Sequence, residues 1–219
     1  MAKYETQHIR NIALVGQAGA GKTTLVETLL HRTGAIGSPG SVERKNTVCD
    51  YDPIEKEHGH SLVPSIVSYE HLGSHVNLLD TPGYLDFVGQ SLTALEAVET
   101  VAVVVNAKSG IEPLTRRMMA RAAERGLDRM IIINRIDNEG VDLAQLVERI
   151  QNTFGKECLP INLPADGGAK VRDCFFKPDG EATDFSGVAE AHTALVEQVV
   201  EVDEKLMEVY LEQGEELSP

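Results

Sequence analysis

The sequence lacks three features that would place it in a specialised class of protein. Its three cysteines, Cys49, Cys158 and Cys174, are widely spaced and odd in number, which fits neither a disulfide framework nor a zinc site. No apolar run is long enough to span a bilayer, and the N-terminus has no signal-peptide pattern. Positive charge is scarce, and a net charge of −14 argues against electrostatic wrapping of nucleic acid. We therefore expect a cytoplasmic folded protein with reduced thiols, no membrane association and no direct sequence-specific contact with nucleic acid.

The charge is spread unevenly along the chain. Residues 1–137 hold 14 Lys and Arg against 16 Asp and Glu, whereas residues 138–219 hold 6 against 18. This asymmetry predicts two regions with different surfaces. A chain of 219 residues, 42% of them hydrophobic, is long enough to bury a core as one or two units.

Strand and helix patterns alternate over the first two thirds of the chain. Residues 12–15 are a β-branched and apolar run that ends at Gly16, and a helical stripe then reaches Gly34. Two runs around Gly73 predict a hairpin, residues 65–70 and 75–80. The later expected elements are helices near 85–95, 114–125 and 143–154 and strands at 100–106 and 129–134. This order predicts an α/β fold with a mostly parallel sheet and helices on both faces, in three layers.

Two segments depart from that alternation. Residues 35–64 are polar and rich in glycine, proline and charge, and they are too long for an idle connection, so we expect a functional mobile loop. After Gly155 the pattern changes to short strands at 159–163 and 171–177 and helices near 188–200 and 202–211. We interpret this acidic part as a small inserted α+β subdomain.

A glycine-rich motif follows the first predicted strand. It fits G-x-x-x-x-G-K-[ST] and consists of Gly16, Gln17, Ala18, Gly19, Ala20, Gly21, Lys22 and Thr23, with Thr24 next in the helix. Glycines let backbone N–H groups surround a phosphate, and a helix N-terminus favours negative charge. Lys22 can reach the terminal phosphates and the Thr23 hydroxyl can bind Mg²⁺. This pattern predicts a P-loop NTPase without naming the nucleotide.

Two further motifs end predicted strands. The first is Asp80, Thr81, Pro82 and Gly83, in which the carboxylate could hold Mg²⁺ through water, although such a sequence alone is more often a tight turn. The second is Asn134, Arg135, Ile136 and Asp137. The Asp137 carboxylate only accepts hydrogen bonds, so it suits the ring N–H and amine of guanine rather than adenine. Because all three motifs fall at carboxyl ends of strands, they predict one guanine-nucleotide site.

These motifs together resemble the GTPase domain of elongation factor G and its divergent paralogues among the translational GTPases. The resemblance rests on N-I-A-L-V-G-Q-A-G-A-G-K-T-T from Asn11, D-T-P-G-Y-L-D-F from Asp80 and N-R-I-D from Asn134. It implies binding and hydrolysis of GTP with Mg²⁺, with activity that depends on the ribosome. The tail from Glu204 to Leu211 resembles the end of that family's inserted subdomain, which suggests docking to the ribosomal stalk protein.

The resemblance also assigns roles to single positions. The stretch from Asp50 to Ser61 resembles the family's first switch and places Ser61 on a threonine that binds Mg²⁺ and meets the γ-phosphate. We call residues 35–64 the first switch segment and residues 83–98 the second. Tyr84 stands where the family has its catalytic histidine, and Lys22 is the other catalytic candidate. Arg135 replaces the usual lysine of the guanine motif, where its stem can still lie along the base.

The resemblance divides the chain at residue 138. Residues 1–138 are expected to form the GTP-binding core, and residues 139–219 the last core helix and the acidic subdomain. No guanine-contacting S-A-[KLF] loop follows Asp137, so we expect the chain to end before the final strand and loop of such a domain.

Three functions follow as hypotheses. The first is a ribosome-dependent GTPase. The second is a nucleotide-dependent ribosome-binding switch that hydrolyses little because of Tyr84, and the third is a P-loop ATPase or kinase. A metal site on His58 and His60, and a contact of the Arg117, Arg121 and Arg125 stripe with ribosomal RNA, are weaker alternatives to ordinary surface side chains.

Overall fold

The chain divides into two compact units, residues 1–134 and residues 135–219. The computed structural model describes residues 4–178, 182–201 and 207. The predicted functional boundary after residue 138 stays a prediction.

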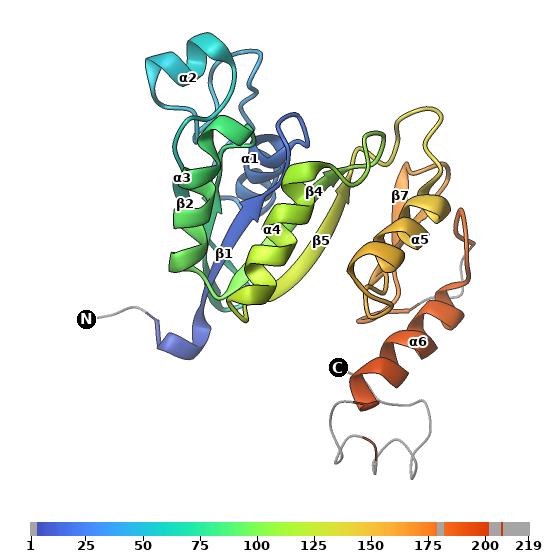
Figure 1. The fold of residues 1–219 in the computed structure, drawn as a ribbon. Coiled ribbons are helices and arrows are strands. Elements are labelled where there is room, and N and C mark those ends of the chain that lie inside the picture. The colour runs from blue at the N-terminus through green and yellow to red at the C-terminus, as the bar shows by residue number, and fades with distance from the viewer. Residues whose placement is uncertain (1–3, 179–181, 202–206, 208–219) are drawn as a thin grey trace. The chain divides into compact units, whose positions relative to one another are not determined.

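The first unit is built on a five-stranded sheet. Its strands are β1 (Ile9–Val15), β2 (Ser65–His71), β3 (Ser74–Asp80), β4 (Thr100–Asn106) and β5 (Asp128–Asn134). They lie in the order β2-β3-β1-β4-β5, and β2 alone runs antiparallel, to β3. The carboxyl ends of the four parallel strands therefore meet at one edge, the upper edge in Figure 1.

Helices cover both faces of this sheet. α1 (Lys22–Arg32) lies behind the sheet in Figure 1, and α3 (Val88–Ala94) and α4 (Pro113–Glu124) lie in front of it. Short 3₁₀ helices, Thr6–His8, Leu85–Phe87 and Leu95–Ala97, complete the unit together with α2 (Pro53–His58). The predicted three-layer α/β fold with a mostly parallel sheet is confirmed.

The centre of the core is β4, as its run of β-branched residues predicts for a strand buried on both faces. Its five residues Val101 to Val105 are each at most 1% exposed. Ala102 and Val104 pack with Leu14, Val26 and Leu30 beneath α1. The alternate residues face the other side, where α4 contacts β4 and β5.

The second unit contains two helices and a small hairpin among its described residues. These are α5 (Leu143–Phe154), β6 (Asn162–Ala165), β7 (Lys170–Asp173) and α6 (Val188–Glu201), with β6 and β7 antiparallel. Leu163 and Cys174 of the hairpin region pack against Val188, Ala191 and Leu195 of α6. The helix expected at 202–211 lies outside the described residues, apart from residue 207.

The first switch segment contains an element that the sequence analysis did not assign. α2 begins at Pro53 after Asp52, whose carboxylate accepts a hydrogen bond from the Ile54 N–H at 2.7 Å. It ends at Gly59, which has a left-handed φ of 70°. A capping aspartate, a proline at the first position and a glycine at the end are the signals of a helix, even one of six residues.

Among the described residues, no helix has the length and apolar character needed to cross a membrane.

The packing of α4 leads to a stability prediction. Met118 lies on α4 with 0% exposure, whereas Met130 on β5 is 44% exposed. We expect Met118→Ala to lower the free energy of unfolding by about 2–5 kcal/mol because it leaves a cavity. Met130→Ala, the matched control, should cost less than about 1 kcal/mol. Urea unfolding of both variants measures the difference, and equal losses would contradict this placement of the core.

Candidate functional site

The loop between β1 and α1 has a backbone that requires glycine. Gly16 has a φ of 138°, and a Cβ atom there would lie 2.3 Å from the Val104 carbonyl oxygen. Gly21 has a left-handed φ of 94° and immediately precedes α1. The strand therefore turns sharply into the helix, and the N-terminal N–H groups of α1 open toward the upper edge of the sheet, where they favour an anion.

Lys22 lies inside this loop with 6% exposure. Its ammonium donates hydrogen bonds to the carbonyl oxygens of Gly16 at 2.8 Å and Gln17 at 3.1 Å. Burial lowers the pKa of Lys22 to about 8, while the negative charges of Asp80 and Glu112 oppose that shift. The side chain is held where a phosphate above the loop would stabilise its positive charge.

Thr23 and Asp80 meet next to this lysine. The Thr23 hydroxyl donates to Asp80 Oδ2 at 2.6 Å, and Asp80 is 1% exposed. Its other carboxylate oxygen, Oδ1, is buried without a hydrogen-bond partner among the described residues. Burial raises the pKa of Asp80 to about 6; Thr23 and Lys22 oppose that shift, and Asp50 and Glu55 add to it.

A hydroxyl beside a buried carboxylate is the oxygen donor set that Mg²⁺ prefers. The free lone pairs of Asp80 Oδ1 fit the ion directly or through water. The residues present therefore suit a magnesium ion at this position.

Gly83 lies directly against the glycine loop. Its carbonyl oxygen accepts a hydrogen bond from the Ala18 N–H at 2.9 Å. A Cβ atom on Gly83 would lie 2.5 Å from the Ala18 nitrogen and 2.5 Å from the Lys22 ammonium. The second switch segment thus begins in contact with the loop and its lysine, at a point where only glycine fits.

The two residues before Gly83 are fixed by side-chain hydrogen bonds. Thr81 donates to the Leu14 carbonyl at 2.7 Å, and Ser91 of α3 donates to the Pro82 carbonyl at 2.8 Å. Both hydrogen bonds are buried. The turn after β3 is therefore anchored to β1 on one side and to α3 on the other.

Buried carboxylates, which the sequence analysis did not single out, hold the first switch segment. Glu27 of α1 is 1% exposed and accepts hydrogen bonds from the N–H groups of Gly40 at 2.7 Å and Val48 at 2.5 Å. Glu55 of α2 is also 1% exposed and accepts from the Leu62 N–H at 2.8 Å. The one sequence signal for Glu27 is an acidic residue in the apolar stripe of a helix.

Ser61 lies in a hydrogen-bond group of its own. Its hydroxyl donates to Asp50 Oδ1 at 3.0 Å, and Thr47 donates to Asp50 Oδ2 at 2.9 Å. The structure therefore brings Thr23 and Asp80 together but places Ser61 on Asp50. Asp50 is close enough for its charge to raise the pKa of Asp80, so the two groups are neighbours.

Asn134, the first residue of the guanine motif, contacts the glycine loop. Its side-chain amide donates to the Ala20 carbonyl at 2.9 Å. This bond ties the end of β5 to the turn that precedes α1. Within the first unit, the other two sequence motifs thus both contact the glycine loop, one through Gly83 and one through Asn134.

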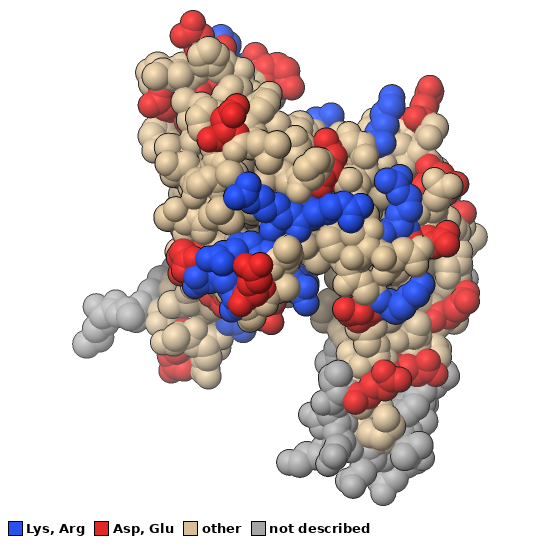
Figure 2. Space-filling view, in the orientation of Figure 1, with Lys and Arg blue, Asp and Glu red and all other residues tan. Residues whose placement is uncertain are grey.

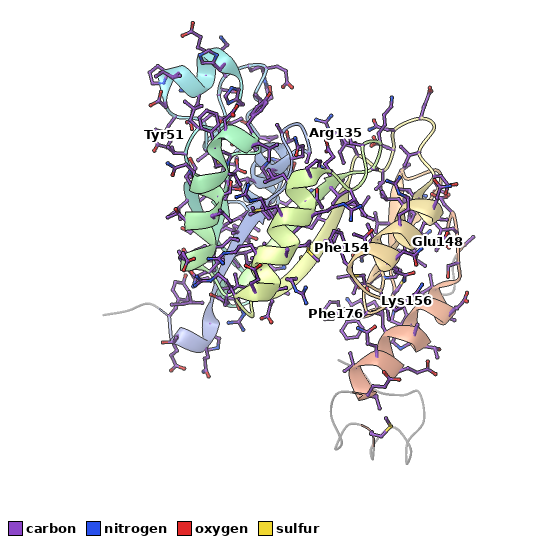
Figure 3. All side chains as sticks on the ribbon, viewed as in Figure 1. Tyr51, Arg135, Glu148, Phe154, Lys156 and Phe176 are labelled. Carbon is purple, nitrogen blue, oxygen red and sulfur yellow. The ribbon has the colours of Figure 1, made fainter. Side chains whose placement is uncertain are left out.

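The remaining residues of the guanine motif belong to the second unit. Arg135, labelled at the end of β5 in Figure 3, has a φ of 59°, and the chain turns through Ile136 and Asp137. Asp137 is exposed. A Cβ atom on Gly168 would lie 2.4 Å from the Ile136 carbonyl, and Asp184 accepts from the Gly168 N–H at 2.8 Å. The turn after β6 therefore packs against the guanine motif. No sequence pattern predicts this contact.

Tyr84 follows Gly83 with its side chain 43% exposed. It precedes the 3₁₀ helix Leu85–Phe87, and its ring contacts that of His60, with 4.6 Å between ring centroids. No group of three or more His, Cys, Asp or Glu residues in the described part of the chain is arranged to hold a metal ion. The nearest observed neighbour of the His60 ring in the second switch segment is Tyr84.

Lys and Arg side chains gather over α4 on the face shown in Figure 2. Arg116 and Arg117 are exposed there. Arg121 lies 3.8 Å from Glu96 and 3.1 Å from Glu124, and Arg125 also pairs with Glu96. This stripe is thus partly neutralised by ion pairs at its C-terminal end.

A glycine loop with a buried lysine, placed beside a threonine–aspartate pair at the carboxyl ends of parallel strands, defines a P-loop nucleotide-binding domain. The sequence model of the family described as "Elongation factor Tu GTP binding domain" matches residues 7–218. The chain belongs to this family of translational GTPase domains.

Similar proteins agree with this assignment. The chain is 35% identical to an elongation factor G-like protein of Mycobacterium tuberculosis, over 93% of this chain and 30% of that protein. It is 31% identical to peptide chain release factor 3 of Symbiobacterium thermophilum, over 95% of this chain and 40% of that one. A crystal structure of a Thermus thermophilus protein aligns with a TM-score of 0.83 and 38% identity, over 94% of this chain and 33% of that chain. The chain spans only these fractions of its relatives.

The buried Asp80 carboxylate makes the stability of the nucleotide-free protein depend on pH. Its pKa in the folded state is about 6 against an ordinary 3.8, so the folded state binds more protons than the unfolded state between these values. Stability must therefore fall as pH rises through this window, by roughly 2 kcal/mol for one such group. Asp80→Asn should remove that fall.

Urea unfolding in EDTA at pH 4.5 and pH 7 tests this. We expect the free energy of unfolding of Asp80→Asn to increase relative to that of the wild type as the pH rises. If the difference in free energy of unfolding between the two proteins is the same at both pH values, the raised pKa of Asp80 is contradicted. Glu99→Gln, on a carboxylate whose pKa is lowered, is the control of opposite sign.

Proposed function

We propose that the chain binds GTP and GDP with Mg²⁺ and hydrolyses GTP on the ribosome as the GTPase domain of an elongation factor G-like translation factor. The observation that carries the proposal is the hydrogen bond of Thr23 to the buried Asp80 at 2.6 Å, next to Lys22 inside the glycine loop. The names of the relatives, elongation factor G-like protein and release factor 3, support the link to translation.

The phosphates would be bound by the loop and the helix it precedes. The N–H groups of residues 16–24 would surround them, and Lys22 would neutralise the terminal charge. Thr23, Asp80 and Ser61 would hold Mg²⁺, Asp80 through water, and the ion would offset charge on the β- and γ-phosphates. Ser61 must then leave Asp50, to which it now donates at 3.0 Å. A γ-phosphate would thus draw the first switch segment inward.

The second switch segment would respond to the same phosphate. The Gly83 carbonyl accepts a hydrogen bond from the Ala18 N–H at 2.9 Å. This N–H belongs to the loop, and we assign it to a phosphate. Binding would therefore break this bond and free the peptide between Gly83 and Tyr84 to turn, which would move Tyr84 relative to the γ-phosphate. Thr81 and Pro82, held by Leu14 and Ser91, would act as the fixed base of this movement.

The base would be selected by the guanine motif. We assign Asn134 and Asp137 to hydrogen bonds with the loop and the base, and we assign the stems of Arg135 and Ile136 to packing beside the base. The resemblance further suggests that the acidic residues after 200 dock the ribosomal stalk protein. That segment lies almost wholly outside the described residues, and the stalk contact remains a proposal from sequence.

A second candidate is a nucleotide-dependent ribosome-binding switch that hydrolyses little. Tyr84 favours it, because a phenol next to the loop cannot carry positive charge at neutral pH. The family match argues against an ATPase or kinase. Phosphate release from GTP, measured with and without ribosomes and with ATP as control, separates the candidates. Ribosome-stimulated release from GTP supports the GTPase, whereas ribosome binding that depends on GTP without release supports the switch.

Guanine selectivity follows from the acceptor character of Asp137. Asp137→Asn exchanges one acceptor oxygen for a donor, so it should shift binding from guanosine toward xanthosine nucleotides. Competition against labelled GDP measures this, with Asn138→Ala as the neighbouring control. If ATP displaces GDP from the wild type as well as GTP does, Asp137 does not select the base.

Tyr84 should limit the rate of hydrolysis while leaving GTP binding intact. Its hydroxyl can position the attacking water, so Tyr84→Phe should lower the single-turnover rate on the order of a hundredfold. Tyr84→His should raise the ribosome-stimulated rate, because an imidazole can also carry charge. Equal rates for the wild type and both variants would show that Tyr84 only lines the pocket.

A further inference from the structure

The guanine motif ends in a closed turn of the second unit. The Asn138 N–H donates to the Arg135 carbonyl at 3.3 Å, so residues 135–138 span one turn. The peptide between Ile136 and Asp137 is the middle of this turn. It is bonded directly to the Cα atom of Asp137, so any shift of this peptide is passed to the side chain that we assign to the base. The position of the Asp137 carboxylate therefore depends on what packs against the turn.

Gly168, in the turn after β6, packs against this peptide. It is buried, and a Cβ atom on it would lie 2.8 Å from the Ile136 carbonyl carbon and 3.1 Å from the Asp137 nitrogen. Its backbone has a left-handed φ of 81°. Gly167, its exposed neighbour, has a left-handed φ of 65°, but a Cβ atom there would meet nothing within 4 Å. Both positions favour glycine for their backbone, but of the two only Gly168 also needs it for packing on the guanine motif.

Asp184 holds the turn that carries Gly168. Its two carboxylate oxygens accept hydrogen bonds from the N–H groups of Gly167 at 2.9 Å and of Gly168 at 2.8 Å. Its own N–H donates to the Pro164 carbonyl of β6 at 2.8 Å. Hydrogen bonds to an ionised acceptor are about twice as strong as those between neutral groups, and glycine has the most backbone freedom to lose. The carboxylate therefore fixes two residues that would otherwise move easily, and it is itself tied to the strand before the turn.

We propose that Asp184 and Gly168 are positioning residues for guanine recognition, which hold Asp137 in place from the turn after β6. This inference rests on the proposed function. Asp184 acts through the backbone of Gly168, Gly168 acts through the Ile136–Asp137 peptide, and only Asp137 contacts the base. Because hydrogen bonds weaken steeply with poor distance and angle, a shift of this peptide by about half an ångström weakens the bonds to guanine. Base selection thus depends on a hairpin that lies outside the three nucleotide motifs.

Two glycine variants test the contact through nucleotide affinity. Gly168→Ala and Gly167→Ala each place a methyl group on left-handed backbone, but only the first methyl group meets the guanine motif. We expect Gly168→Ala to bind GDP about tenfold more weakly than Gly167→Ala, because a weakened hydrogen bond to a charged group has an effect of this size. Calorimetric titration measures both affinities, and equal values for the two variants overturn the proposal.

Discrimination between guanine and hypoxanthine separates positioning from a general loss of structure. IDP keeps the ring N–H of the base but lacks the exocyclic amine, so the ratio of GDP to IDP affinity reports the second hydrogen bond of Asp137. We expect Asp184→Ala to lower this ratio several-fold. A variant that is merely less stable binds both nucleotides less well and keeps the ratio. Asp184→Ala also carries the test if Gly168→Ala does not fold.

Asp173→Ala is the matched control for Asp184→Ala. Asp173 is the last residue of β7, at the end of the hairpin away from the turn. Its carboxylate also accepts hydrogen bonds from two consecutive N–H groups, those of Phe175 at 2.8 Å and Phe176 at 2.9 Å. Asp173→Ala should leave the GDP to IDP ratio unchanged. An unchanged ratio in Asp184→Ala, or a ratio lowered equally by both variants, contradicts the proposal.

NMR spectra of the nucleotide-free protein test the positioning contact separately from the proposed function. The amide resonances of Asp137 and Asn138 should shift in Asp184→Ala and should keep their positions in Asp173→Ala. If the wild type binds GDP no better than ADP, the proposed function fails, and a shift in Asp184→Ala still supports the contact between the turn and the guanine motif. Unchanged Asp137 and Asn138 resonances in Asp184→Ala refute that contact, whatever the nucleotide affinities are.

Discussion

The structure depends on two opposite charges that are buried side by side at the edge of a parallel sheet. Lys22 is 6% exposed and Asp80 is 1% exposed, and one carboxylate oxygen of Asp80 has no hydrogen-bond partner among the described residues. Taking such groups out of water is costly: the pKa of Lys22 is lowered to about 8 and that of Asp80 is raised to about 6. A bound phosphate would stabilise the positive charge of Lys22, and a bound metal ion would stabilise the negative charge of Asp80. The two buried charges therefore lower the stability of the fold, and a bound nucleotide with its metal ion would raise it. This gain in free energy would be available to move the switch segments.

The switch segments are held by hydrogen bonds, some of which a bound nucleotide would replace. Glu27 of α1 holds the Gly40 and Val48 N–H groups of the first segment, and Glu55, within that segment, holds the Leu62 N–H. Ser61 and Gly83, in contrast, are held by Asp50 and by the loop itself. These two contacts involve the atoms that we assign to the nucleotide complex. Nucleotide binding would thus replace a small set of hydrogen bonds while the carboxylate anchors remain, which confines the movement to residues near the phosphate.

Sequence patterns predicted the strands and the phosphate loop well, because both are local. The run Thr100 to Asn106 was assigned as a strand with the bounds that β4 has, and the hairpin around Gly73 formed as β2 and β3. Gly16 and Gly21 are required by backbone geometry, which the motif encodes directly. The rule that parallel strands end at one edge predicted that the three motifs gather there, and in the structure Thr23 contacts Asp80 and Asn134 contacts Ala20.

The remaining features depend on contacts between residues far apart in the chain. Nothing local shows that Glu27 would bind N–H groups of residues 40 and 48, that Gly168 would pack on Ile136, or that His60 would face Tyr84. α2 was missed because a six-residue helix has too few apolar positions to show a period, although its capping residues were present. The site assignments themselves remain predictions, because the roles of these residues require a nucleotide.

The magnesium dependence of nucleotide binding tests the central claim most directly, because the Thr23 and Asp80 pair is assigned to the metal ion. Calorimetric titration of GDP should show clearly tighter binding with Mg²⁺ than with EDTA, and Thr23→Ala should abolish that gain while binding in EDTA persists. Thr24→Ala, on the exposed next residue of α1, should keep the gain. GDP affinities that are the same with Mg²⁺ and with EDTA in the wild type would contradict the account.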